Sequence, residues 1–401
     1  GETESEKQQV FFKTIQNVIK EQSLSILCDM NGSARCLSID KQFLSDQGIN
    51  FISFNDIAGN IVHAIIPEGE NLQYCAKEME ALHNSGKTDV LLAYMPDCDG
   101  DRGNIVYWNT HTQRAEILQA QEVFALCVLS ELAYSVYRAK QNNQSDNLKL
   151  AVAVNGPTSM RIDDIAKVFD AKVCRAEVGE ANVVNRAREL RNEGYSVPIL
   201  GEGSNGGNIT HPAAVRDPMN TLFALIKLLT LKSNGDTPGL FELWCKKSGQ
   251  PEKYNQNFSF ADISETLPHY TSTGGSEKRG LLHIKSKNHI TLKANLQKLF
   301  VAAWEEKKDS LLSAYGIVSW DALATVGTEE KSCTEDFTLS MSGGLKIRFK
   351  TQEGISASVW MRASGTEPVF RIMCDAKGKN TETEKELLDW VTKLLEKADT
   401  M

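Results

Sequence analysis

The segment Pro96-Asp97-Cys98-Asp99-Gly100-Asp101-Arg102-Gly103 directly follows an apolar run at residues 90–95. Its three carboxylates stand at every second position, so in a strand they would share one face and repel each other. The segment is therefore predicted to be either a solvated turn or a cation site. Mg2+ prefers such oxygen ligands and, beside a phosphate group, needs few of them from the protein.

Other interpretations of this segment can be weighed against the residues around it. An EF-hand loop would require Gly and Glu at its sixth and twelfth positions, where this chain has Arg102 and Trp108, so that interpretation fails. A phosphoaspartyl phosphatase would use Asp97 as nucleophile and Asp99 as acid/base, but it normally has a hydroxyl residue in the place of Asp101. A plain surface turn rich in Asp and Gly remains open. Arg102 beside the acids favours a site that holds a metal and a phosphoryl oxygen together.

Length and composition narrow the class of protein. The chain has 401 residues, which suggests two to four domains, and its 41% hydrophobic and 24% charged residues are ordinary for a soluble globular protein. The net charge of -8 argues against nucleic acids and anionic membranes as partners. Nine scattered cysteines without a C-x-x-C pair predict reduced, buried thiols in a cytoplasmic protein, and no apolar run is long enough for a membrane span.

The hydrophobic pattern predicts a β-α-β-α-β order before the Asp segment. Such an order favours a doubly wound sheet, in which ligands bind at the carboxyl ends of the strands, where the Asp segment falls. A hairpin and a long helix complete this part. The expected helices lie at residues 5–21, 34–47, 71–84 and 121–140, and the expected strands at 24–30, 50–55 and 89–95, with a hairpin strand at 104–109 and its turn at 109–112.

After a polar linker at residues 141–147 the same pattern begins again, which predicts a second sheet of the same topology and two halves of one site. Residues 235–280 are rich in turn residues and receive no assignment. The fold class is therefore α/β, with two consecutive doubly wound mixed α/β domains (1–147 and 148–280) and a smaller α+β domain with an antiparallel sheet (281–401). The remaining elements are expected as strands at 148–154, 172–178, 197–200, 345–349, 355–361 and 369–374, and as helices at 159–169, 180–192, 291–315 and 381–397.

The second loop of interest is Gly201-Glu202-Gly203-Ser204-Asn205-Gly206-Gly207, which formally matches the dinucleotide pattern G-x-G-x-x-G. A dinucleotide site needs a helix directly after the loop and an acid about 20 residues further on, whereas Pro212 and Pro218 delay the helix and Lys227 stands near the acid's place. The alternative is a polar ligand such as a sugar, with Glu202 accepting from its hydroxyls and Ser204 donating or accepting. A tight turn with a solvated Glu also remains open.

The third loop is Arg362-Ala363-Ser364-Gly365-Thr366-Glu367-Pro368, which lies between two expected strands, with Arg371 just beyond it. A guanidinium group, two hydroxyls and a glycine that exposes backbone N–H groups suit a phosphate-binding loop. An ordinary hairpin rarely gathers these residues together.

The three loops in this order resemble the α-D-phosphohexomutase family of phosphoglucomutases and phosphomannomutases, and Asp29-Met30-Asn31-Gly32 is similar to a turn at the start of that family's second domain. The resemblance covers essentially the whole chain and implies a hexose phosphate substrate, a hexose bisphosphate intermediate and Mg2+, but no nucleic acid and no membrane. It implies that Arg102 contacts a phosphoserine. The other implied roles are Mg2+ binding by Asp97, Asp99 and Asp101, hydroxyl recognition by Glu202 and Ser204, and binding of the non-transferred phosphate by Arg362, Ser364, Gly365, Thr366 and Arg371.

The sequence also departs from the family's pattern. Nothing in it matches the phosphoserine loop of the family's first domain, so we expect the N-terminal phosphoserine domain to be missing from this chain, and the chain alone to be inactive, with an apolar face that this domain would cover. The His that often follows Gly-Glu-x-Ser-Gly is absent, and His211 is a weak substitute. The implied activity of the intact protein is interconversion of hexose 1-phosphate and hexose 6-phosphate; the alternative is a non-catalytic sugar-phosphate binding protein.

Overall fold

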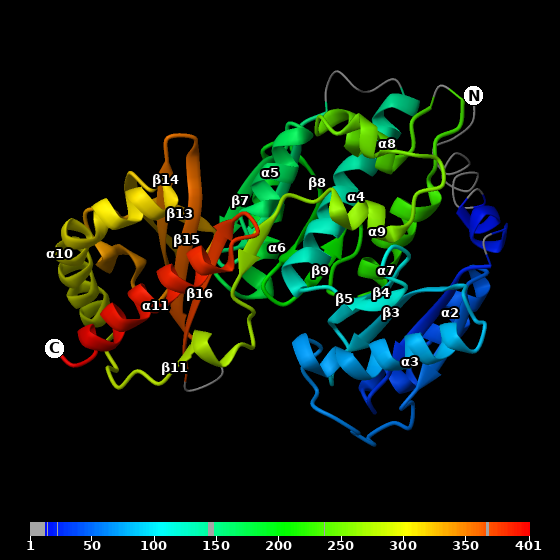
Figure 1. Cartoon of the computed structure of the whole chain (residues 1–401), viewed down its shortest axis with the longest axis horizontal. Helices are drawn as coiled ribbons and strands as arrows, with labels where there is room; N and C mark the ends of the chain where they lie inside the picture. Colours follow the sequence, from blue (N-terminus) through cyan, green and yellow to red (C-terminus); the bar gives the residue numbers. More distant parts are fainter. Residues whose placement is uncertain (1–12, 14, 22, 143–147, 236, 366–368) are drawn as a thin grey trace. The chain divides into compact units, whose positions relative to one another are not determined.

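The computed structural model describes residues 13, 15–21, 23–142, 148–235, 237–365 and 369–401 (Figure 1). The chain divides into two compact units. Unit 1 comprises Gly1–Leu150, Ile165–Ala171 and Asn205–Leu267, and unit 2 comprises Ala151–Asp164, Lys172–Ser204 and Pro268–Met401. The mixed α/β fold class is confirmed, while the three-domain division expected from the sequence stays a prediction.

Unit 1 contains a five-stranded mixed sheet with the strand order β2-β1-β3-β4-β5. Strand β1 pairs in parallel with both β2 and β3, whereas β3-β4 and β4-β5 are antiparallel, so the predicted β-α-β-α-β order and its hairpin are correct. The three central strands are almost wholly buried because their residues are apolar on both faces. The strands span Ser25–Asp29 (β1), Asn50–Phe54 (β2), Val90–Pro96 (β3), Gly103–Asn109 (β4) and Arg114–Ile117 (β5).

Helix α3 (Gln73–Asn84) packs on this sheet through Cys75, Ala76 and Met79, which contact the buried side chains of β1, β3 and β4. The single helix expected at 34–47 is instead a 3-10 turn (Ala34–Leu37) followed by α2 (Asp40–Asp46). The 235–280 region, which the sequence left unassigned, contains two short helices. The other helices of unit 1 are α4 (Ala120–Gln141), α7 (Pro218–Thr230), α8 (Leu240–Lys247) and α9 (Phe260–Glu265), and β9 spans Gly207–Thr210.

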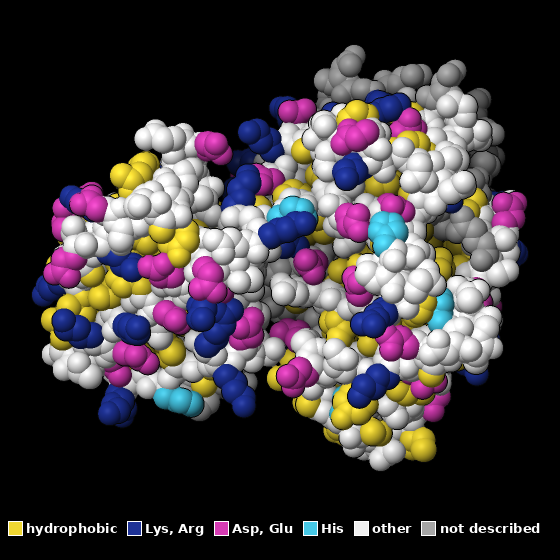
Figure 2. Space-filling view, viewed as in Figure 1, with side chains coloured by type: hydrophobic (Ala, Val, Ile, Leu, Met, Phe, Trp, Pro, Cys, Tyr) yellow, Lys and Arg dark blue, Asp and Glu magenta, His cyan; other side chains and the backbone are white. Residues whose placement is uncertain are grey.

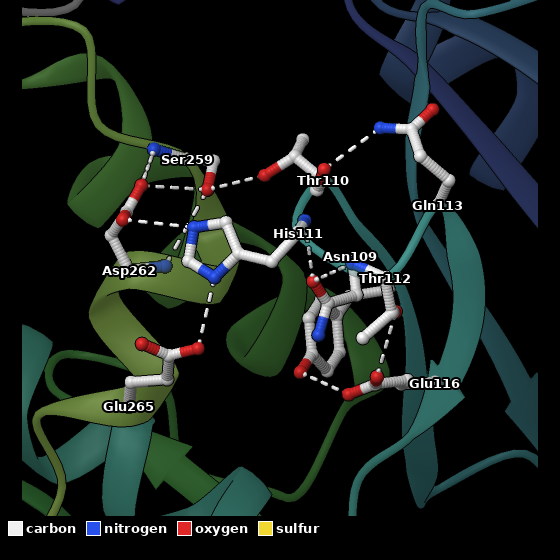
Figure 3. A network of polar contacts seen from close by, with 10 residues as sticks. Asn109, Thr110, His111, Thr112, Gln113, Glu116, Ser259, Asp262 and Glu265 are labelled. Atoms are coloured by element: carbon white, nitrogen blue, oxygen red, sulfur yellow. Dashed lines mark hydrogen bonds and ion pairs between the residues drawn. The ribbon is translucent and has the colours of Figure 1, made fainter.

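A polar network joins the β4-β5 turn to α9 within unit 1 (Figure 3). The His111 ring points between two carboxylates, with Nδ1 2.9 Å from Glu265 Oε1 and Nε2 3.1 Å from Asp262 Oδ1. The hydroxyl of Thr110 donates to Ser259 Oγ at 2.9 Å. The bond to Glu265, followed by the charges of both acids, raises the pKa of His111. This turn is therefore held by contacts that are strongest when the imidazole is charged.

In unit 2, β6 pairs in parallel with β7, and β8 lies on the other side of β6. Helix α6 matches its predicted bounds, and α5, whose second half belongs to unit 1, begins two residues later than predicted. These elements span Leu150–Asn155 (β6), Arg161–Val168 (α5), Lys172–Ala176 (β7), Glu180–Asn192 (α6) and Ser196–Glu202 (β8).

The rest of unit 2 is a seven-stranded sheet in which β10-β16-β15-β14-β12-β13 follow one another and β11 also pairs with β16. Helices α10 (His289–Tyr315) and α11 (Thr381–Ala398) pack on it (Figure 1), and Phe300, Leu387 and Val391 lie in the shared core. The expected α+β arrangement is therefore present. The strands span Tyr270–Ser272 (β10), Leu281–Leu282 (β11), Ser319–Val326 (β12), Glu329–Ser332 (β13), Gly344–Thr351 (β14), Gly354–Ala363 (β15) and Phe370–Lys377 (β16).

All nine cysteines lie within the described residues and all are free. Seven are buried, as the sequence predicts, whereas Cys36 is half-buried and Cys98 is exposed. Cys98 differs because it lies in the Asp loop rather than in an apolar strand or helix.

A group of apolar side chains is exposed in unit 1 between residues 37 and 66. Leu37 and Ile39 are 82% and 75% exposed, and Ile57, Ile61, Val62, Ile65 and Ile66 are exposed as well. Part of this apolar surface is visible at the lower edge of Figure 2. That a further domain covers this apolar surface stays a prediction. Among the described helices, none combines the length and the apolar character that crossing a bilayer requires.

Candidate substrate and metal sites

The Asp loop, residues 97–102, connects β3 to β4 in unit 1 and is closed by its own backbone. Asp97 N–H donates to the Arg102 carbonyl at 3.1 Å, and Gly100 N–H donates to the Asp97 carbonyl at 3.2 Å. Gly100 has a φ of +81°, and a Cβ there would lie 2.7 Å from the Arg35 side chain. Only glycine suits this position, because both the backbone and the space exclude a side chain.

The three Asp side chains converge, with one carboxylate oxygen from each lying within 4.8 Å of the others. Asp97 is buried and accepts from Arg102 Nε at 2.6 Å, while Asp101 accepts from Arg216 Nη2. Asp99 is exposed, and burial raises the pKa of Asp101. Three convergent carboxylates fit a hard divalent cation such as Mg2+, since its ligands are oxygens.

Glu202 and Ser204 lie at the carboxyl end of β8 in unit 2 and share one amide partner. Asn155 Nδ2 donates to Glu202 Oε1 at 3.1 Å and lies 3.4 Å from Ser204 Oγ. Thr158 Oγ1 donates to Asn155 Oδ1 at 2.6 Å and accepts from Gly203 N–H at 3.0 Å. Glu202 is only 5% exposed, so it is a fixed acceptor rather than a solvated turn residue.

The third loop joins β15 to β16, and two arginines stand on these strands beside it. Arg362 and Arg371 stand directly opposite each other in the antiparallel pair. Like charges in this position repel unless something compensates them. Arg371 donates to the Gly275 carbonyl at 2.6 Å, and Arg362 Nε lies 3.1 Å from Glu177 Oε1. Ser364 N–H donates to the Val369 carbonyl at 2.8 Å, and Gly365 is exposed next to it. Thr366 lies outside the described residues.

Several residues of these sites were not singled out by the sequence. Arg216, Asn155 and Glu177 each contact a predicted site residue from a distant part of the chain. Asn155 could have been found, because it ends the apolar strand β6 and is followed by Gly-Pro-Thr. Arg216 and Glu177 carry no such local signal. His211, the suggested acid/base, is exposed in unit 1, and its role stays a prediction.

The Asp29-Met30-Asn31-Gly32 turn lies at the end of β1 in unit 1. Asp29 is fully buried and accepts from Asn55 Nδ2 at 3.0 Å, and His63 Nε2 lies 2.9 Å from its second oxygen. A Cβ at Gly32 would come within 2.4 Å of the Asn60 carbonyl oxygen. These contacts hold the turn in place, which makes Asp29 a structural acid.

Residues 130–243 match the family model of phosphoglucomutase/phosphomannomutase, alpha/beta/alpha domain III. A curated phosphoglucomutase/phosphomannomutase from Thermococcus kodakarensis is 27% identical over 301 residues, covering 75% of this chain and 46% of the relative. The resemblance to the phosphohexomutase family is confirmed. The matched domain includes Asn155, Glu202 and Arg216, whereas the Asp loop and the β15-β16 loop lie outside it.

Two solved structures of phosphohexomutases share the fold. A phosphoglucomutase/phosphomannomutase family protein from Burkholderia thailandensis superimposes with a TM-score of 0.57 at 16% identity, over 97% of this chain and 64% of that one. Parafusin, a phosphoglucomutase from Paramecium, gives 0.58 at 13% identity, over 97% and 60%. The chain therefore spans about half the length of the curated relative and less than two thirds of these solved chains.

Proposed function

We propose that the protein acts as a phosphohexomutase that interconverts hexose 1-phosphate and hexose 6-phosphate through a phosphoserine and a hexose bisphosphate intermediate. The observation that carries the proposal is the facing pair Arg362 and Arg371, with a loop of small and hydroxyl residues between their strands. Two guanidinium groups beside one loop suit the dianionic, non-transferred phosphate of a sugar phosphate. Curated and structural similarity to mutases supports the same class of reaction.

The other residues have roles that follow from their chemistry. Glu202 would accept hydrogen bonds from sugar hydroxyls, and Asn155 keeps its carboxylate oriented. Arg102, held on Asp97, would stabilise the oxygens of the phosphoryl group during its transfer. Mg2+ bound by Asp97, Asp99 and Asp101 would supply charge neutralisation for the same group. We assign no nucleophile to these 401 residues.

The proposal is tested first by ligand binding. Glucose 1-phosphate or mannose 1-phosphate should raise the melting temperature of the 401-residue chain, with a shift that grows with occupancy, whereas glucose should not. A chain that melts cooperatively and responds to neither sugar phosphate would contradict the proposal. The shift should vanish in Arg362→Ala. The matched control is Arg348→Ala, which removes an arginine of β14 whose partner is Asp321 rather than a residue of the loop.

A coupled assay for glucose 6-phosphate, with Mg2+ and catalytic glucose 1,6-bisphosphate present, separates this function from a non-catalytic sugar-phosphate binding protein. The second candidate is favoured by one observation, that nothing in the 401 residues matches the family's phosphoserine loop. We expect background turnover from these 401 residues, because none of them matches the phosphoserine loop. Full turnover from the chain itself would place the nucleophile within it, with Ser204 the first serine to test.

A further inference from the structure

A three-residue segment between β7 and α6, Glu177-Val178-Gly179, contacts both ligand-recognition loops of unit 2. We call this segment the β7-α6 loop. At one end, Glu177 Oε1 lies 3.1 Å from Arg362 Nε. At the other end, Gly179 N–H donates to Glu202 Oε1 at 2.9 Å. The phosphate-binding arginine and the hydroxyl-binding glutamate are therefore held by residues only two positions apart in the chain.

The Glu177 carboxylate is itself fixed by backbone groups. It is 6% exposed and accepts from Val178 N–H at 2.7 Å and from Gly344 N–H at 2.5 Å. Glu177 N–H donates to the Gly327 carbonyl at 2.7 Å. A buried carboxylate is costly unless donors and a cation surround it, and here two N–H groups and a guanidinium group do so.

The link between Glu177 and Arg362 is an ion pair rather than a directed hydrogen bond. Arg362 Nε is buried and makes no hydrogen bond of acceptable angle, although its carboxylate partner is close. The Arg362 side chain is 22% exposed, and its Nη2 lies 3.9 Å from the place where a Cβ of Gly365 would stand. The carboxylate therefore positions the guanidinium group, while Nη2 lies on the side of the β15-β16 loop.

A second cation lies beside the same carboxylate. Lys293 is 1% exposed, and its Nζ donates to the carbonyls of Met341 and Gly343 at 2.9 and 2.6 Å. Burial lowers the pKa of Lys293 to about 8, and the charge of Glu177 opposes this shift. Gly343 directly precedes Gly344, the residue whose N–H binds Glu177. Within the described part of unit 2, the Glu177 carboxylate therefore lies close to two cations, Arg362 and Lys293.

At the other end of the loop, Gly179 adopts a conformation that other residues avoid. Its φ is +118°, and the nearest atom to a Cβ placed there is Asn182 Nδ2 at 3.6 Å. Space would allow a methyl group, but the backbone would be strained. The glycine is therefore needed for the direction of its N–H group toward Glu202.

From these contacts we propose that Glu177 is a positioning residue that fixes Arg362 relative to Glu202, so that the phosphate and the hydroxyls of one ligand are recognised at a set separation. This inference rests on the proposed function and adds a specificity determinant to it. The ligand class that gains from a fixed separation is a hexose phosphate. Orthophosphate, which needs only the arginines, gains nothing from it.

The test is Glu177→Gln in the 401-residue chain, with calorimetric titration of glucose 1-phosphate and of orthophosphate. Glutamine keeps the shape but has a single carbonyl oxygen, so it can accept from only one of the two N–H groups. It also removes the negative charge that pairs with Arg362. We expect the affinity for glucose 1-phosphate to fall about tenfold, a change of about 1.4 kcal/mol. The affinity for orthophosphate should stay the same or rise, because one negative charge near the arginines is lost. Glu353→Gln, an exposed change in the β14-β15 turn, is the matched control and should alter neither affinity.

The outcomes separate this inference from the proposed function. A wild-type chain that melts cooperatively but binds no glucose 1-phosphate contradicts the function. An equal loss for both ligands in Glu177→Gln, or no loss for either, overturns the positioning role alone. If this variant does not melt cooperatively, a double-mutant cycle of Glu202→Gln and Arg362→Lys with Glu177 unchanged decides the matter. We expect the two effects to be coupled by at least about threefold, and strict additivity would overturn the inference.

Discussion

The Asp loop of unit 1 and the β15-β16 loop of unit 2 are both built from charged side chains that are already partly compensated. In the Asp loop, the three carboxylates of Asp97, Asp99 and Asp101 face the two guanidinium groups of Arg102 and Arg216, which leaves one negative charge. Around the β15-β16 loop, Arg362 and Lys293 lie near the carboxylate of Glu177, and Arg371 stands opposite Arg362, so this group contains more cations than anions.

The two loops therefore differ in the sign of the charge that their side chains carry in excess, and this difference affects ligand binding. The side chains are held in place by internal partners, so little ordering remains to be done when a ligand binds. A cation at the Asp loop must compete with Arg216 for Asp101, which weakens binding. An anion at the β15-β16 loop meets an excess of cations, which strengthens it. We therefore expect phosphate recognition to be the stronger of the two, and metal binding to be weak on its own.

The largest expected effect concerns the cationic β15-β16 loop. Arg362→Ala should weaken glucose 1-phosphate binding about 100-fold, or about 2.7 kcal/mol, because a charge-assisted contact to phosphate is lost. Glu202→Gln should weaken it only about fivefold, because hydroxyl contacts mainly choose orientation. Both affinities are measured by calorimetric titration. If Glu202→Gln proves the more damaging change, the two loops have the opposite roles.

A smaller effect is expected at the acidic Asp loop. Arg216→Gln should tighten the binding of Mg2+ alone about threefold, because Asp101 would no longer be shared with a guanidinium group. In contrast, Asp99→Asn should reduce Mg2+ binding below detection. Calorimetry with Mg2+ and no sugar phosphate measures both. Asp46→Asn, a change in α2 away from the loop, serves as the control, and unchanged Mg2+ binding in Asp99→Asn would exclude the metal assignment.

The smallest effect concerns a charged contact that serves structure rather than ligand binding. The neighbouring carboxylates of Glu265 and Asp262 raise the pKa of His111 above its unfolded value of about 6.5 (Figure 3). Its contribution is therefore fully present below pH 6.5 and is lost as the pH rises through the folded pKa. Because the ring is 43% exposed, the effect should be only about 0.5 kcal/mol.

The measurement is the melting temperature at pH 6 and at pH 8. His111→Gln should lower it slightly at pH 6 and hardly at all at pH 8, whereas His283→Gln, an exposed change in unit 2, should have no comparable effect at either pH. An equal loss at both pH values would mean that the ring acts by packing and not by charge.

The parts of the fold that the sequence predicted are those with a strong local pattern. Strands β1, β3 and β6 each contain a continuous apolar run, and α11 places Leu387 and Val391 on one face, so their positions followed from these patterns. Helices α8 and α9 were missed because they are short and lie among turn residues. Strand β13 was missed because it consists of Glu329–Ser332, a polar edge strand without an alternating pattern.

The residues of the candidate sites also differ in whether a local sequence pattern marks them. The sequence singled out Asp97, Glu202 and Arg362 as candidates because each lies in or beside a loop that follows a buried strand. Arg216 and Glu177 were not found, because each joins its partner through the folding of segments far apart in the sequence. One sequence by itself contains no local pattern that identifies such a pair.

The exposed position of Cys98 has a practical consequence. In the sequence it lies between two of the candidate metal ligands, while seven of the other eight cysteines are buried and the last is half-buried. A small maleimide dye at limiting concentration should therefore attach preferentially at the tip of the Asp loop, without any engineered mutation. The unaltered protein thus carries its own attachment point for a spectroscopic reporter of that loop.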